Sequence, residues 1–335
     1  MAIQRKLASI QIVKDVKSIP EAEFIEVIQV LGWKVVCKKN EFKIGDKVIY
    51  VEIDSILPEK PEFEFLRKNN FIIRTLKLRG QVSQGICFPL SILPEGNYNE
   101  GDDVSDLIGV EKYEPPVPVG MDGVFIGRYP SWLPKSDETR VQILQDILDK
   151  YKGVKCYYTE KIDGTSSSFS LYNEDFGVYG RRYRLQPNIN NGYWKVAMKY
   201  NLEEILRKEN RNLAIQGEIT GKYIQGNKYK RNNDDLFFNM FNIWDIDNQQ
   251  YFSYQEFIDF AEYYNIPTVP IISNDYILDN DIDKLIELSK GRSVINPNVR
   301  REGIVIRPLI EINDRFFGRV SFKAINPDFL IKYKE

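Results

Sequence analysis

A lysine stands two residues before an aspartate and a glycine in the segment YYTEKIDGTSSSF, residues 157–169. Lys161, Asp163 and Gly164 fit two interpretations. In the first, a strand runs into a polar turn, because Asp-Gly followed by hydroxyl side chains is common in turns. In the second, Lys161 is a nucleophile. An ordinary lysine, with a pKa of about 10.4, is neutral in only about one molecule in a thousand at pH 7.4, so a nucleophilic lysine needs a lowered pKa.

More charged and aromatic residues follow Lys161 in short segments that resemble strands. Taken singly, each has an ordinary explanation: a glutamate can be an edge-strand charge, a ring can belong to the core, and a lysine can lie at the surface. Their succession after a Lys-x-Asp-Gly motif is more specific than any one of them. In chain order they are Arg181 and Arg182 in VYGRRY, Glu218 in QGEI, Phe241 and Trp244 in FNIWDI, Glu302 in REGIVIRP, and Lys323 in VSFKAI.

The composition excludes several kinds of chemistry. The 335 residues include no histidine, which excludes Ser-His-Asp hydrolysis, Cys-His nucleophiles, histidine-ligated zinc and phosphohistidine intermediates. The three cysteines, Cys37, Cys87 and Cys156, lack metal-ligand spacing, and we expect reduced thiols. No apolar run approaches the roughly 18 residues of a membrane span, and the N-terminal segment lacks the apolar core of a signal peptide. We therefore expect a cytoplasmic protein that does not contact a membrane.

The charge is distributed unevenly along the chain. The net charge of −2 gives no overall signal for a polyanionic partner. Residues 150–235 contain 16 Lys and Arg against 10 Asp and Glu, a local +6, whereas residues 236–335 contain 11 against 15, a local −4. Positive charge gathered around the lysine motif can attract phosphates. A chance drift of sign along a solvated surface explains the charge alone equally well.

The hydrophobic pattern divides the chain into two domains. Short runs rich in Val, Ile, Tyr and Phe, separated by Gly, Asp, Asn and Pro, predict a small β-barrel over residues 1–115. A segment dense in Pro and Gly predicts a linker over 116–135. Residues 136–335 are predicted to begin with a helix in SDETRVQILQDILDK and to continue as strands, with helices near 195–210, 253–264 and 279–290. The predicted fold class is α+β.

The segment EKIDGT resembles the active-site lysine motif of the covalent nucleotidyltransferases, which include polynucleotide ligases and messenger-RNA capping enzymes. The later segments resemble the successive nucleotide-pocket motifs of that superfamily in order and spacing. DNA ligases and capping enzymes carry an OB fold after the last motif, but only 12 of the 335 residues follow Lys323. With its β-rich module first, nearly the whole chain resembles the RNA ligases of the Deinococcus and Naegleria type. That resemblance implies an OB-like β-barrel, then a nucleotidyltransferase domain of antiparallel sheets flanked by helices.

The same resemblance implies an ATP-dependent RNA ligase that seals 3′-hydroxyl/5′-phosphate nicks. Lys161 would form a lysyl-AMP intermediate, AMP would pass to the 5′-phosphate, and the 3′-hydroxyl would then attack to join the strand. Family members favour nicked duplexes whose 3′-hydroxyl strand ends in RNA, so this is the expected partner, and we expect a monomer. The absence of histidine and of a kinase phosphate loop predicts that 3′-phosphate ends stay unjoined.

The resemblance also implies a role for each site residue. Asp163, Glu218 and Glu302 would hold Mg²⁺ or Mn²⁺, mainly through water, and so lower the pKa of Lys161. Lys323 would neutralise the α-phosphate of ATP. The remaining implied nucleotide contacts are Arg140, on the first helix, at the outer phosphates, Glu160 and Ile162 beside the lysine, Arg182 or Arg181 at ribose or the RNA phosphate, and Phe241 or Trp244 at adenine.

The sequence departs from the family's last motif at one position, and other functions for the chain stay open. The last motif of such ligases often has a second basic residue, whereas this chain has Ser321 there and Arg319 as the nearest upstream base. A DNA ligase or a messenger-RNA guanylyltransferase would use the same lysine chemistry. A nucleic-acid-binding protein with an inert pocket is the non-enzymatic alternative. An inert pocket would be expected to lose Lys161 or its carboxylates, and their presence favours an enzyme.

Overall fold

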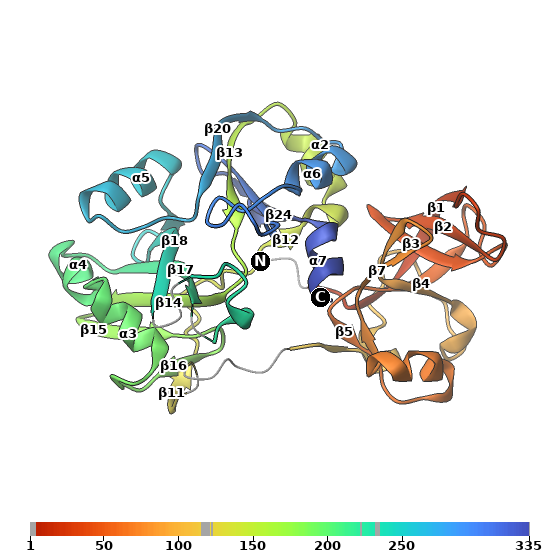
Figure 1. Ribbon diagram of the computed structural model, residues 1–335, viewed down its shortest axis with the longest axis horizontal. Coiled ribbons are helices and arrows are strands. Elements are labelled where there is room, and N and C mark those ends of the chain that lie inside the picture. The colour runs from red at the N-terminus through yellow and green to blue at the C-terminus, as the bar shows by residue number, and fades with distance from the viewer. Residues whose placement is uncertain (1–4, 115–120, 122, 222, 232–234, 335) are drawn as a thin grey trace.

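The computed structural model describes residues 5–114, 121, 123–221, 223–231 and 235–334. Two β-rich modules lie side by side, the first in red and orange and the second in yellow to blue (Figure 1). None of the described helices is long and apolar enough to cross a membrane. Cys37, Cys87 and Cys156 are free thiols, as predicted, and the last two are buried.

The first module is a curled antiparallel sheet in the order β3-β2-β1-β4-β9. β1 bends at an irregularity between Val13 and Asp15, so that its first half pairs with β4 and its second half with β2. This bend wraps the sheet around a core that includes Trp33 and Tyr50. The elements are β1 (Ala8–Ser18), β2 (Ile25–Val30), β3 (Trp33–Lys38), β4 (Lys47–Val51), β5 (Ser55–Ile56), a 3-10 helix (Pro61–Asn69), β6 (Ile72–Ile73), β7 (Thr75–Leu78), β8 (Gln81–Gln84), β9 (Ile86–Pro89), a 3-10 turn (Leu90–Ile92), α1 (Ser105–Ile108) and β10 (Glu111–Lys112).

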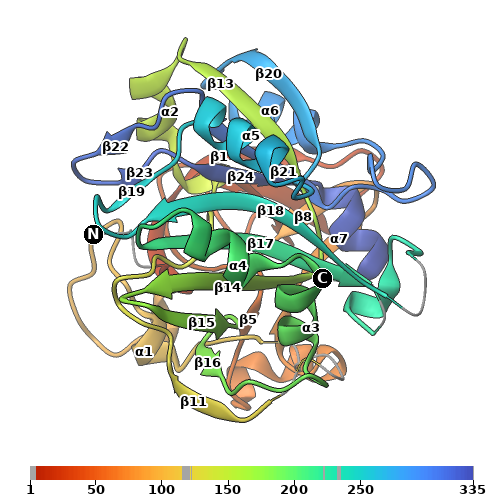
Figure 2. The same cartoon turned by 90° about the vertical axis from the view of Figure 1, so that its left-hand side faces the viewer.

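The second module contains two larger sheets with helices around them (Figure 2). A seven-stranded sheet has the order β11-β16-β15-β14-β17-β18-β19, and a five-stranded sheet has the order β12-β24-β21-β13-β20. The strands are β11 (Phe125–Arg128), β12 (Thr139–Arg140), β13 (Lys155–Lys161), β14 (Thr165–Tyr172), β15 (Asp175–Tyr179), β16 (Tyr183–Leu185), β17 (Leu213–Gly221), β18 (Leu236–Asp245), β19 (Gln250–Tyr251), β20 (Ile271–Ile277), β21 (Gly303–Pro308), β22 (Asn313–Asp314), β23 (Gly318–Arg319) and β24 (Phe322–Ile325).

The helices predicted near 195–210, 253–264 and 279–290 are confirmed. They are α3 (Gly192–Lys199) with α4 (Leu202–Lys208), α5 (Tyr254–Tyr263) and α6 (Ile282–Ser289); the described helices also include α2 (Gln145–Tyr151), α7 (Pro327–Tyr333) and short 3-10 turns (Val141–Ile143 and Gln225–Asn227). α5 begins at a capping box, in which Ser253 and Glu256 satisfy each other's backbone amides. α7 has no counterpart among the helices predicted from the sequence.

The prediction of one helix across residues 136–150 is wrong in its first part. Thr139 and Arg140 form β12, which pairs in parallel with Phe322 and Lys323 of β24, and α2 begins only at Gln145. The apolar spacing does form a helix from Gln145 onward. Before it, pairing of residues 139–140 with a distant strand overrides local helix propensity. Arg140 therefore lies on a strand.

The predicted linker, 116–135, falls partly outside the described residues, which omit 116–120 and 122. Within its described part, Phe125–Arg128 form β11, which pairs with β16 of the second module. The domain boundaries themselves stay a prediction.

The two modules share a hydrophobic core at α7, which lies at their junction in Figure 1. Phe329 and Leu330 of α7, with Ile325 before it, belong to the same buried cluster as Trp33 and Tyr50 of the first module. Backbone contact reinforces this packing, since the amide of Gly32 donates to the carbonyl of Gln142 at 2.8 Å. The first module therefore packs against the second through a shared core as well as being joined to it by the chain.

Replacing Phe329, which is fully buried, by alanine is expected to lower the free energy of unfolding by about 3–5 kcal/mol, because the cavity opens in the core shared by both modules. Urea denaturation followed by tryptophan fluorescence measures this loss, since Trp33 lies in the same cluster. Phe316→Ala is the matched control, because the Phe316 side chain is 77% exposed and should change stability little. Equal midpoints for the two variants would contradict the shared core.

Candidate active site

The chain crosses from the five-stranded to the seven-stranded sheet immediately after Lys161. β13 ends at Lys161 and β14 begins at Thr165, so the motif makes the crossing. Gly164 has to be glycine, because a Cβ there would lie 2.3 Å from the carbonyl oxygen of Ile219. The crossing lines a cavity of about 500 Å³ that is bounded by both sheets and reaches Asp54 of the first module.

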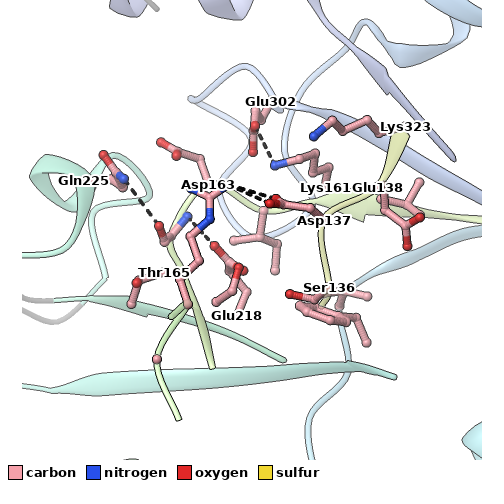
Figure 3. A pocket seen from close by; sticks show the side chains of 18 of the residues that line it. Ser136, Asp137, Glu138, Lys161, Asp163, Thr165, Glu218, Gln225, Glu302 and Lys323 are labelled. Carbon is pink, nitrogen blue, oxygen red and sulfur yellow. Dashed lines mark hydrogen bonds and ion pairs between the residues drawn. The ribbon is translucent and has the colours of Figure 1, made fainter. Parts of the chain in front are cut away.

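Strand register places the opposite-charge partner of Lys161. Lys161 pairs with Gly303 across β13 and β21, so Glu302 lies next to it at the start of β21. The Lys161 Nζ donates a hydrogen bond to Glu302 Oε1 at 2.6 Å (Figure 3). Burial lowers the pKa of Lys161, but Glu302, Glu218 and Asp163 raise it by more, to about 12. In the free protein Lys161 is therefore an ammonium ion.

Glu218 enters from β17 and faces the same lysine. Its Oε1 accepts a hydrogen bond from the backbone amide of Gly164 at 3.0 Å, which fixes the carboxylate beside the crossing. Burial raises the pKa of Glu218 to about 8, and the negative charges of Glu302 and Asp163 act in the same direction against the lowering effect of Lys161. The site therefore holds more carboxylate charge than Lys161 alone compensates.

Asp163 is held by residues that the sequence reasoning missed. Lys228 donates to Asp163 Oδ2 at 2.5 Å, and the Asp163 amide donates to the Tyr229 hydroxyl at 2.8 Å. Lys228 also lies over the rings of Phe329 and Tyr333 of α7, at 5.1 and 4.7 Å. Lys228 and Tyr229 belong to no motif recognised in the sequence, so only the fold brings them to the site.

The carboxylates fit a hydrated divalent cation. Glu302 Oε2 is buried without a hydrogen-bond partner among the described residues, and the three oxygen-bearing side chains have the donor chemistry that Mg²⁺ and Mn²⁺ prefer. Within the described part of the chain, no three such side chains converge closely enough to ligate one ion directly. Contact with a cation largely through water stays a prediction.

Lys323 lies on the face of the sheet that carries Lys161. It pairs with Val305 of β21, which in turn pairs with Thr159, two residues before Lys161. Burial lowers the pKa of Lys323 to about 7, and the nearby positive charges of Arg140 and Lys161 lower it as well. A cationic group that is this costly to ionise is suited to receive an anionic phosphate.

Arg140 is the neighbour of Lys323 on β12 and connects the site to the first module. Its guanidinium donates to Asp54 Oδ2 at 2.7 Å and lies over the Trp33 ring. Asp54 was not predicted, because an ion pair between residues 86 positions apart has no local sequence signal.

Glu160, Ile162 and Phe241 line the cavity, as do Val269 and Val305. Glu160 is buried, its Oε2 accepts the backbone amide of Val294 at 2.7 Å, and burial raises its pKa. Trp244, the alternative ring, instead packs in a separate core cluster and donates its indole N–H to the carbonyl of Trp132. The structure thus places Phe241, and not Trp244, at the cavity.

Arg181 and Arg182 also line the cavity, on the loop between β15 and β16. Arg181 pairs with Asp137 at 2.8 Å, and Arg182 pairs with Glu114. Arg319, the nearest basic residue upstream of Lys323, is not among the residues that line the cavity. It pairs with Glu311, and its guanidinium lies 3.6 Å from the Tyr251 ring centre.

Comparison with known families now identifies the chain. An OB-fold domain family matches residues 7–90, and the RNA ligase family matches residues 154–325, half of the chain. The chain belongs to the RNA ligase family. This confirms the predicted RNA ligase and its amino-terminal OB-like domain.

Solved structures agree with that assignment. The ligase is 36% identical to the Naegleria gruberi RNA ligase, with a TM-score of 0.91. The match to a variant with ATP and Mn covers 98% of this chain and 99% of the other, as does the match to a variant with AMP and Mn. A structure of that ligase with PPi is matched over 99% of both chains. The comparison with curated proteins finds no match.

If Glu218 helps to hold the metal, its raised pKa makes metal binding depend on pH. Because Glu218 is mostly protonated below pH 8, we expect the affinity for Mn²⁺ without nucleotide to rise about tenfold from pH 6 to pH 7 and to level off above pH 8. Calorimetric titration of Mn²⁺ across this range measures the slope. Glu218→Gln should flatten it, whereas Glu311→Gln, whose carboxylate pairs with Arg319, should keep it. An unchanged slope in Glu218→Gln would refute the link.

Proposed function

We propose that the protein is an ATP-dependent ligase that seals nicks with a 3′-hydroxyl and a 5′-phosphate through AMP bound to Lys161. The observation that carries this proposal is one cavity in which Lys161 meets Glu302, Glu218, Asp163 and Lys323. The ATP, AMP, PPi and Mn of the Naegleria gruberi structures support ATP as donor and Mg²⁺ or Mn²⁺ as the metal. A monomer acting in the cytoplasm is part of the proposal.

In the first step, the neutral amine of Lys161 attacks the α-phosphorus of ATP. A nitrogen–phosphorus bond forms, the bond to the β-phosphate oxygen breaks, and pyrophosphate leaves with the electron pair. Lys161 has first to lose its proton, which the charge of Glu302, 2.6 Å away, opposes. A divalent cation held by Asp163, Glu218 and Glu302 would offset that charge and lower the pKa of the lysine.

Other side chains bind and orient the nucleotide. Lys323 supplies positive charge to the α-phosphate as negative charge develops there, and phosphate binding raises the pKa of its ammonium again. Phe241, Ile162 and Glu160 receive the adenine end of the nucleotide. Arg140, beside Lys323 and at the opening toward the first module, meets the outer phosphates, which requires it to share or release Asp54.

The second and third steps use the same cavity. A 5′-phosphate oxygen of the nicked strand attacks the phosphorus of lysyl-AMP, the nitrogen–phosphorus bond breaks, and Lys161 takes up a proton. The 3′-hydroxyl then attacks the 5′-phosphate, loses its proton, and releases AMP. Arg181 and Arg182 lie at the cavity wall where they can contact the incoming strand.

Lys161→Met should abolish attachment of AMP, a loss of at least about a thousandfold, because the amine proposed to form the nitrogen–phosphorus bond is removed. Incubation with α-labelled ATP followed by denaturing electrophoresis measures the label on the protein. Lys155→Met, on the exposed start of the same strand, is the matched control and should be labelled normally. Labelling by GTP in preference to ATP would instead indicate a guanylyltransferase, and labelled Lys161→Met would refute the nucleophile.

The substrate preference is tested with four nicked duplexes that carry RNA or DNA on each side of the break. We expect sealing with ATP and Mg²⁺ or Mn²⁺ only where the 3′-hydroxyl strand ends in RNA, and no sealing of a 3′-phosphate nick. Equal joining of the all-DNA nick would make the protein a general nick ligase. Joining of a 3′-phosphate end would overturn the proposed end chemistry.

A further inference from the structure

An exposed aromatic pair lies on the edge of the seven-stranded sheet. Phe125 of β11 is 53% exposed, and Tyr183 of β16 is 37% exposed. Val124 and Ile126, on either side of Phe125, are exposed as well. β11 is the last strand of the sheet, at the lower end of the second module in Figures 1 and 2. A sheet edge this apolar needs an occupant.

The two rings form a stack. Their centres are 4.4 Å apart and their planes differ by 23°. Because each ring covers one face of the other, the exposed surface of the pair lies on the outer faces and edges. The antiparallel pairing of β11 with β16 holds the rings in this arrangement, with Arg128 opposite Tyr183. The pair is therefore a preformed flat surface rather than two loose side chains.

The surroundings of the pair indicate a nucleic-acid occupant. Both rings line the cavity that contains Lys161, and the loop from Gly180 to Arg182 lines it beside them. Arg181 and Arg182 precede Tyr183, and Arg184 follows it. Aromatic faces beside guanidinium groups are the combination that binds bases by stacking and the backbone by charge. Arg181, Arg182 and Arg184 pair with Asp137, Glu114 and Asp175, so the phosphates of a bound strand would exchange with these carboxylates.

The nucleotide donor does not occupy this pair. In the proposed function the adenine lies against Glu160, Ile162 and Phe241, which line the cavity, and Phe241 lies on β18. Four strands, β16, β15, β14 and β17, separate β18 from β11 in the sheet. A base on the Phe125–Tyr183 pair is therefore a second base, brought by the strand that receives AMP.

We propose that Phe125 and Tyr183 form a stacking platform for a nucleobase of the RNA substrate next to the break. This inference rests on the proposed ligase function and adds a contact that orients the substrate. Stacking there would place the end of the strand along the wall formed by Arg181 and Arg182, which leads to Lys161. The pair takes no part in the attack of Lys161 on ATP.

The test separates the two half-reactions. In Phe125→Ala, Tyr183→Ala and the double variant, labelling of Lys161 by α-labelled ATP should stay within about twofold of wild type. Sealing of a pre-adenylylated nick below saturation should fall about 5- to 100-fold, the range expected for a lost base stack. Tyr183→Phe should retain most of the sealing rate because the ring remains. Tyr263→Ala, which removes an 81% exposed ring on α5, is the control and should seal normally.

A modified substrate identifies the stacked base. Nicks are prepared with an abasic nucleotide at the 3′-hydroxyl end, at the 5′-phosphate end, or at neither. One abasic position should slow the wild type by the same factor as ring removal, and the double variant should lose nothing further on that substrate. If the double variant sealed every abasic nick more slowly than wild type by the same factor as it seals the intact nick, the platform would be overturned. Normal sealing of the intact nick by the double variant would overturn it as well.

Two other outcomes are informative. If ring removal also reduces AMP attachment, or lowers the thermal unfolding midpoint by several degrees, the pair supports the fold or the ATP pocket and the platform is overturned. If wild type forms concentration-dependent dimers that Phe125→Ala abolishes, the occupant is a second copy. Failure of wild type to label Lys161 or to seal any nick would instead refute the proposed ligase function, which a failed platform leaves intact.

Discussion

The concentration of carboxylates around one half-buried lysine, Lys161, is the constraint on which the site depends. Glu302, Glu218 and Asp163 all raise the pKa of Lys161, and burial, with a smaller contribution from the charges of Glu302 and Asp163, raises the pKa of Glu218 to about 8. Buried charges of one sign are costly unless opposite charges accompany them. Lys161 and Lys228 provide part of that compensation within the chain. In the proposed function a divalent cation supplies further positive charge when Glu218 is ionised.

The crossing between two sheets makes this concentration of charge possible. β13, β21 and β24 are neighbours in one sheet, and β14 and β17 are neighbours in the other. The Ile162–Gly164 turn joins them so closely that no side chain fits at Gly164. Side chains that are far apart in sequence are therefore fixed by strand register, which is more rigid than a loop. A side chain held this way loses little entropy when a bound group meets it.

The first module is part of the site and not a separate attachment. Asp54 lines the cavity and pairs with Arg140, while α7 completes the core around Trp33. Lys228 touches both α7 and Asp163, so one side chain contacts both the junction of the modules and the Ile162–Gly164 turn. Movement of the first module would therefore disturb the contacts of Arg140 and Lys228 at the cavity.

Some features follow from the sequence alone because they are local. The Lys-x-Asp-Gly turn, the apolar strand runs and the periodic helices at 192–208, 254–263 and 282–289 all rest on spacing within a few residues. The order of the motifs sufficed to name Lys161, Glu218, Phe241, Glu302 and Lys323, all of which line one cavity. The absence of histidine from the sequence excluded several chemistries without any structure.

Other features were decided only by the tertiary structure. Arg140 lies on a strand because β24 pairs with it, and Trp244 packs in a core cluster, where the carbonyl of Trp132 accepts its N–H. Asp54 reaches the cavity from the first module, where it pairs with Arg140. Lys228 reaches it from the segment after β17, where it pairs with Asp163. The protonation states of Lys161, Glu218 and Lys323 also depend on neighbours 50 or more residues away along the chain. Sequence spacing encodes the periodicity of a strand or helix, but pairing register and Coulombic distance exist only once the chain has folded.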